Sequence, residues 1–155
     1  MLRDTIKAAQ ITAMKAGDKP RLAAVRLILA KLKDKDIELR PSIASGAAAL
    51  PDDDVLVTDV LQKMAKQRRE SITMFVQGGR QELADIEQAE LAVIEEFMPI
   101  QMGEDETRAA IAAIIAELGA AGMKDMGKVV GALKAQHGTQ LDMGKASGLV
   151  KAALG

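Results

Sequence analysis

Lysines near the end of the chain are the residues whose type and spacing best fit a chemistry, the binding of phosphate groups. In the segment KDMGKVVGALK, Lys124 and Lys128 are one helical turn apart, and Lys134 follows on a different face. Lys145 and Lys151 come from the last apolar-periodic segment. Basic side chains on the ends and flanks of short helices can contact the phosphates of a nucleic acid. These five lysines are therefore the candidate nucleic-acid-binding residues.

A second charged cluster, KQRRE, lies in the segment expected to form a long third helix. Arg68 falls close to the apolar stripe of that segment, so we expect it to form an ion pair with an acidic residue of the fourth helix. Arg80 follows the pair Gly78–Gly79 and could anchor the turn. For Arg68, Arg69 and Arg80 we favour structural roles, with binding of an anion or a protein partner as the alternative.

Side chains for catalysis or metal binding are scarce. The chain has no Cys and one His, which excludes disulfides, thiolate chemistry and a metal site built on a His pair. His137 stands next to Gly138 at an expected helix end, where it can interact with the helix dipole. Carboxylates crowd the expected fourth helix, namely Glu82, Asp85, Glu87, Glu90, Glu95 and Glu96. We interpret them as a solvated face and predict no catalytic residue, no metal and no cofactor.

The elements that position these side chains are helices. Apolar residues recur at intervals of three and four in most of the chain, and aromatic residues make up only 1% of it. That low content argues against a β-sandwich or barrel and against base stacking. Gly17 should end a first helix, and Asp18 should cap a second. Residues 40–51, with two Pro, two Ser and a Gly, predict a loop.

The third and fourth helices are expected to form a second hairpin around the Gly78–Gly79 turn. We expect Ile86 and Phe97 to be among the inward-facing residues of the fourth helix. The fold class is therefore all-α, with about four helices in a helical-hairpin N-terminal domain, residues 1–98. Residues 99–155 should form a small three-helix C-terminal domain.

Caps and glycines punctuate the expected C-terminal domain. Gly122 and Asp125 are spaced like a capping box, and Asp142 should cap the last helix. Gly127 and Gly131 lie four residues apart, and each costs about 1 kcal/mol in a helix relative to Ala. Close packing of a neighbouring helix is the favoured explanation for them. Close approach of a nucleic-acid backbone is the alternative.

Charge varies strongly along the chain. The formal charge is +5 over residues 1–50, −9 over residues 51–107 and +3 over residues 108–155. Such a distribution suggests surfaces with different partners. No apolar run reaches the ~18–20 residues of a membrane span, and the N-terminal segment is unlike a secretory signal. We therefore expect a cytoplasmic protein without a membrane partner.

Several segments, in this order, resemble the YqeY family: AMKAGDKPRLAAVRLILAKLK, KQRRESITMFVQGGRQELADIEQAELAVIEEFMP, and MKDMGKVVGALKAQHG with LDMGKASGLVKAAL. The last two also resemble the tail domain of GatB, a subunit of the tRNA-dependent amidotransferase. The resemblance implies two all-α domains, with tRNA as the suspected partner of the tail. An aminoacyl-tRNA synthetase or an amidotransferase subunit is a further possible partner. The resemblance supplies no catalytic residue.

Three hypotheses follow. The first is a stand-alone tRNA-binding accessory protein, related to the amidotransferase but without catalysis of its own. The second is a protein–protein interaction module whose acidic hairpin docks on a synthetase or another partner. The third is a component of a glutamine-dependent carbon–nitrogen ligase, an aminoacyl-tRNA amidotransferase.

Overall fold

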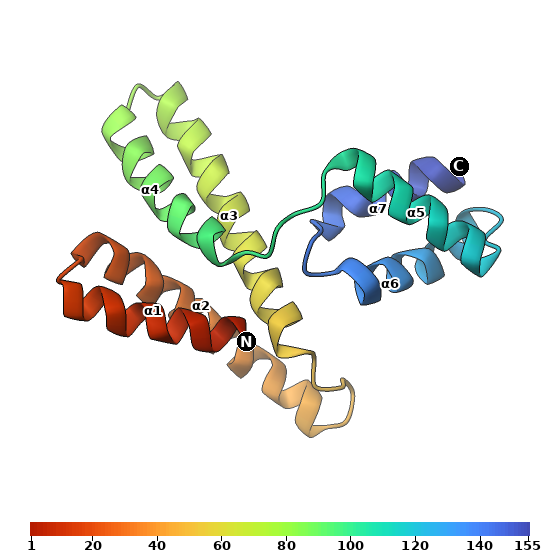
Figure 1. Cartoon of the computed structure of the whole chain (residues 1–155), viewed down its shortest axis with the longest axis horizontal. Helices are drawn as coiled ribbons and strands as arrows, with labels where there is room; N and C mark the ends of the chain where they lie inside the picture. The colour runs from red at the N-terminus through yellow and green to blue at the C-terminus, as the bar shows by residue number, and fades with distance from the viewer. The chain divides into compact units, whose positions relative to one another are not determined.

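The computed structural model describes all residues from 1 to 155 and confirms the all-α fold class. The chain divides into two compact units, Met1–Met98 and Pro99–Gly155, each with its own core (Figure 1). Seven α-helices and one short 3₁₀ turn make up the secondary structure, and no strand is present. None of the helices has both the length and the apolar composition to cross a membrane.

The N-terminal unit consists of two helical hairpins. Its helices are α1 (Leu2–Ala16), α2 (Lys19–Ala44), α3 (Asp53–Gln77) and α4 (Gln81–Phe97). The first hairpin turns at Gly17, which adopts a left-handed conformation with φ of 68°, as predicted. The Asp18 carboxylate then accepts a hydrogen bond from the backbone N–H of Arg21 and caps α2, which is also as predicted.

The core of the N-terminal unit draws on all four helices. Its most deeply buried large side chains are Ile6, Val25, Ile28, Leu32, Val57, Leu61 and Ile94. Burying such a side chain contributes about 1.5–3 kcal/mol. The core therefore fixes α1 and α2 against the first half of α3 and the second half of α4.

The predicted loop at residues 40–51 is wrong at its start. Helix α2 continues to Ala44 and contains Pro41 within its last turns. Proline lacks an N–H and costs a helix one hydrogen bond, which is why the sequence favoured a loop there. Partial burial of Leu39 against the core and of Ile43 offsets that cost, and Gly46 ends the turn with φ of 72°.

The inward face predicted for α4 is also partly wrong. Ile86 is 57% exposed, whereas Ala84, Leu91, Ile94 and Phe97 are buried. The apolar residues of α4 cover more than one side of the helix, so their spacing alone could not select the buried side.

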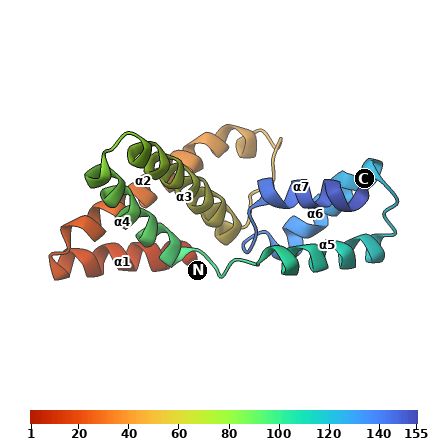
Figure 2. The ribbon, with the colours of Figure 1, turned by 90° about the horizontal axis from the view of Figure 1, so that it is seen from above.

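The C-terminal unit is a bundle of three helices. They are α5 (Glu104–Leu118), α6 (Met126–His137) and α7 (Met143–Leu154), and each contacts the other two. A 3₁₀ turn (Met123–Asp125) precedes α6. The buried residues of its core are Ile111, Ile114, Val129, Leu133, Leu141, Ala146 and Val150. Figure 2 shows these three helices from a second direction.

Candidate nucleic-acid interface

The five candidate lysines all lie in the C-terminal unit, on α6, on α7 and on the turn before α6. Every one of them is exposed. The Lys128 side chain keeps 77% of its accessible surface, and its ammonium lies 3.8 Å from the Asp125 carboxylate. Helices α6 and α7 themselves contain no Asp or Glu, so their outer surfaces are cationic.

The start of α6 is built by Asp125. Its carboxylate accepts a hydrogen bond from the backbone N–H of Ala121 at 3.0 Å, one residue before the Gly122 expected from a capping box. The chain then turns through the 3₁₀ segment before α6 begins. This local bond fixes the segment that carries Lys124 and leads to Lys128.

The start of α7 follows the prediction. The Asp142 carboxylate accepts from the backbone N–H groups of Gly144 at 2.9 Å and Lys145 at 3.4 Å. This cap satisfies two of the N–H groups that a helix start leaves without an intrahelical partner. Lys145 therefore projects from the first, well-capped turn of α7.

Helical periodicity places the buried residues of α6 and α7 on one side of each helix and leaves the lysines and glycines outside that side. Val129 and Leu133 are the buried residues of α6, and Ala146 and Val150 are those of α7. At about 100° per residue, the glycines of α6 lie on the side opposite Val129 and Leu133.

The favoured explanation for Gly127 and Gly131 is therefore wrong. Both glycines are exposed, and a Cβ atom added to either would meet no atom within 4 Å. No neighbouring helix approaches them, because their face points away from the three-helix core. The alternative explanation, close approach of a nucleic-acid backbone, stays a prediction.

The three candidate arginines lie in the N-terminal unit, in the α3–α4 hairpin. Arg68 Nε lies 2.8 Å from Glu90 Oε2 and 3.3 Å from Glu87 Oε2 across the two helices. Arg68 Nε and Glu87 Oε2 are both buried without a well-aligned hydrogen bond, so the contact is an ion pair rather than a bidentate bond. The structure thus joins Arg68 to the fourth helix.

The other two arginines of the hairpin are more exposed. Arg69 pairs with Glu95 of α4, and Arg80 bonds Glu82 at 2.8 Å near the turn. The hydrogen bond from Arg80 lowers the pKa of the Glu82 carboxyl, although both side chains face solvent. These arginines and the candidate lysines belong to different units of the chain.

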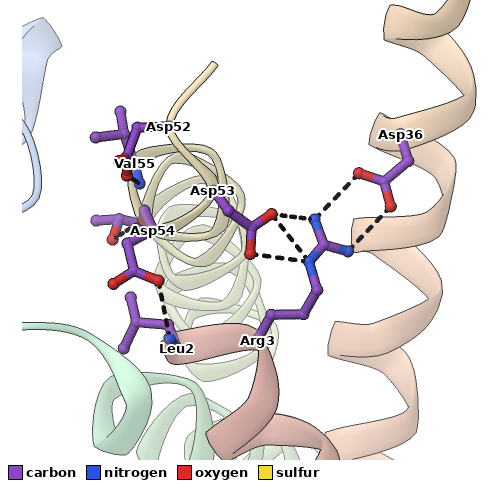
Figure 3. A network of polar contacts seen from close by, with 8 residues as sticks. Leu2, Arg3, Asp36, Asp52, Asp53, Asp54 and Val55 are labelled. Atoms are coloured by element: carbon purple, nitrogen blue, oxygen red, sulfur yellow. Dashed lines mark hydrogen bonds and ion pairs between the residues drawn. The ribbon is translucent and has the colours of Figure 1, made fainter. Parts of the chain in front are cut away.

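An ion cluster that joins three helices surrounds Arg3, and it was not predicted from the sequence. Its guanidinium bonds Asp36 of α2 at 2.9 Å and Asp53 of α3 at 2.8 Å, while the backbone N–H of Leu2 donates to Asp54 (Figure 3). Hydrogen bonds from Arg3, first of all to Asp53, raise the pKa of its guanidinium. The partners lie 33 and 50 residues away along the chain, beyond the reach of local sequence patterns.

A second pair between the hairpins was also missed. Arg21 of α2 bonds Glu96 of α4 at 2.7 and 2.8 Å, and its guanidinium carbon lies 5.9 Å from the centre of the Phe97 ring. The hydrogen bond raises the pKa of Arg21 and lowers that of Glu96. No group of three or more His, Cys, Asp or Glu side chains is arranged to hold a metal ion.

The chain is similar to one known protein family and to several curated relatives. The protein family described as "Yqey-like protein" matches residues 3–154. A curated relative from Eremothecium gossypii, "Altered inheritance of mitochondria protein 41, mitochondrial", is 34% identical over 60% of this chain and 48% of its own length. The protein of the same name from Kluyveromyces lactis is 28% identical over 68% of this chain and 54% of its own.

The chain thus spans about half the length of the curated relatives it matches. Their names also correct one prediction. These relatives are named as mitochondrial proteins, which contradicts the cytoplasmic location expected from the sequence.

Proposed function

Because this chain belongs to the family of Yqey-like proteins, we propose that it is a tRNA-binding accessory protein, related to the amidotransferase and without catalysis of its own. The observation that carries the proposal is the surface of α6 and α7, where exposed lysines stand on helices that contain no carboxylate. A polyanion is the partner that such a surface attracts most strongly.

The type of contact follows from the side chains. Lysine ammonium groups neutralise phosphates and fix position, but they read little base sequence. The C-terminal unit contains no Phe, Tyr or Trp, so it has no aromatic platform on which bases could stack. Recognition would therefore rest on the RNA backbone and its shape.

The bare glycine face of α6 supports the same partner. Without side chains at Gly127 and Gly131, a phosphate backbone can come closer to the helix than it could over larger residues. The neighbouring Lys128 supplies the charge. Helix stability is lower for these glycines, and a binding role explains why that cost is tolerated.

Filter binding of tRNA at low salt tests the proposal. We expect saturable binding by the full chain, and replacing Lys124 and Lys128 together by Glu should weaken it by about tenfold or more. The matched control replaces Lys63 and Lys66, two exposed lysines of α3, by Glu. This variant should bind tRNA as the wild type does. No binding at low salt, or equal loss in both double variants, would refute the proposal.

A second function has a different observation in its favour. Three large apolar side chains are exposed near the α3–α4 turn: Met74 is 70% exposed, Val76 51% and Ile86 57%. Together with the carboxylates of α4 they could dock a synthetase or an amidotransferase subunit. Co-purification with such a subunit after nuclease treatment, lost when Met74 and Ile86 are changed to Ser, would support this alternative. Persistence in that variant would argue against it.

A further inference from the structure

The two helices that carry the lysines are copies of one sequence pattern. Residues 125–135 read DMGKVVGALKA, and residues 142–152 read DMGKASGLVKA. The Asp, Met, both Gly, both Lys and the final Ala coincide when the segments are aligned with an offset of 17 residues. Each segment begins at or just before a helix start.

The structure repeats the pattern in space. From Met126 to Ala135 and from Met143 to Ala152, every aligned pair of residues has the same degree of burial. Val129 and Ala146 are buried at one aligned position. The same holds for Leu133 and Val150, and all four belong to a single core.

The outward positions repeat as well. Lys128 and Lys134 of α6 correspond to Lys145 and Lys151 of α7, and all four are exposed. Within each helix the two lysines are about 9 Å apart along the axis, from a rise of ~1.5 Å per residue. We call these the α6 pair and the α7 pair.

The two pairs are held in one body. Residues 138–142 join the helices, and Leu141 in this link is only 3% exposed and packs in the shared core. The α6 pair and the α7 pair therefore belong to one packed unit, and they do not move as separate arms.

We infer that the C-terminal unit binds double-helical rather than single-stranded RNA, with the α6 pair and the α7 pair acting as two equivalent phosphate contacts. This inference rests on the proposed function and specifies its substrate. A duplex presents two equivalent phosphate backbones, which match two equivalent lysine pairs. Single strands are bound chiefly through aromatic stacking, for which the unit has no side chain.

Competition between RNA forms tests the inference. The full chain is titrated with tRNA, with a 20-base-pair RNA duplex and with one strand of that duplex, at one fixed low salt concentration. We expect the duplex to bind at least about tenfold more tightly than the strand. Binding of tRNA with equal or tighter binding of the strand would overturn the inference but leave the proposed function intact. Failure to bind any of the three RNAs would overturn the proposed function itself.

Variants of each pair test the equivalence. Changing the α6 pair to Gln and changing the α7 pair to Gln should weaken duplex binding by the same factor, within about twofold, since each removes two phosphate contacts. Arginine in place of either pair should retain binding, and far-ultraviolet circular dichroism checks that each variant is folded. Loss from only one of the two variants would overturn the inference.

Discussion

The two units use their cations in opposite ways. In the N-terminal unit, Arg3, Arg21, Arg68 and Arg69 each pair with a carboxylate from another helix. In the C-terminal unit, lysines stand exposed on helices that contain no carboxylate. Arginines of the N-terminal unit thus connect helices, whereas the lysines of α6 and α7 lie on the exposed sides of their helices.

The choice of residue type fits this division. Arginine has a planar guanidinium that suits fixed, bidentate pairs, as in the contact of Arg3 with Asp36. Lysine carries a compact, mobile charge that suits a phosphate backbone without a fixed register. We therefore expect substitutions of the paired arginines to lower the stability of the N-terminal unit, and substitutions of the exposed lysines to weaken RNA binding.

The largest expected effect is on the stability of the C-terminal unit. Leu133 is fully buried, and Leu133→Ala should destabilise the unit by about 2–5 kcal/mol. A domain of this size has a small stability margin, so RNA binding should be lost with its fold. Hydrogen exchange would show loss of protection in α5, α6 and α7 while α1 to α4 stay protected. Equal loss of protection in both units would contradict the separate cores.

Removal of the Arg3 cluster should have the next largest effect. Arg3→Ala leaves Asp36 and Asp53 without their partner, and charge-assisted hydrogen bonds contribute about 1.5–3 kcal/mol. The control is Arg108→Ala, which removes an exposed pair with Glu104 within α5 and should cost about 0.3–0.5 kcal/mol. Urea denaturation measures both. Similar costs for the two variants would show that the cluster does not connect the helices.

Replacement of Gly131 by Ala should change the stability of the C-terminal unit and its RNA binding in opposite directions. An added Cβ meets no atom there, so Gly131→Ala should stabilise the C-terminal unit by about 1 kcal/mol. If a phosphate backbone approaches this face, the same change should weaken RNA binding. Gly119→Ala is the control, because Gly119 has φ of 63° and should lose stability instead. A Gly131→Ala variant that gains stability and binds RNA normally would exclude the glycine face from the interface.

The smallest effect concerns the pH dependence of the N-terminal unit. Arg21 lowers the pKa of Glu96 from its ordinary value of 4.5, so the pair stabilises the fold above that pH. The contribution should disappear as the pH falls through the lowered pKa. Since both side chains are partly exposed, Glu96→Gln should cost less than about 1 kcal/mol at pH 7. Urea unfolding should show this difference at pH 7 and a smaller difference at pH 2. A constant difference at both pH values would rule out the ion pair as its source.

Local signals in the sequence predicted much of the fold. Gly17, Asp18 and Asp142 define helix ends through their own backbone and side-chain preferences, and the structure confirms all three. Pro41 misled the prediction, because the partial burial of Leu39 and Ile43 that keeps α2 helical depends on the tertiary fold.

Less of the candidate site than of the fold could be predicted from the sequence. The lysines could be selected by residue type and spacing. The exposure of Gly127 and Gly131 could not be predicted, because it depends on which face of α6 packs in the core. The Arg3 cluster depends on partners from three helices, which no local pattern contains. The internal repeat of residues 125–135 and 142–152 is visible in the sequence alone, when residues 99–155 are aligned with themselves.

The salt dependence of tRNA binding tests the central claim most directly. If the four lysines of the α6 and α7 pairs contact phosphates, a plot of log affinity against log salt should have a slope of about −3 to −4. Replacement of all four by Gln should leave a slope no steeper than about −1, the share of the remaining Lys124, while the helical content stays unchanged. An unchanged slope in the quadruple variant would contradict the claim that these lysines hold the RNA.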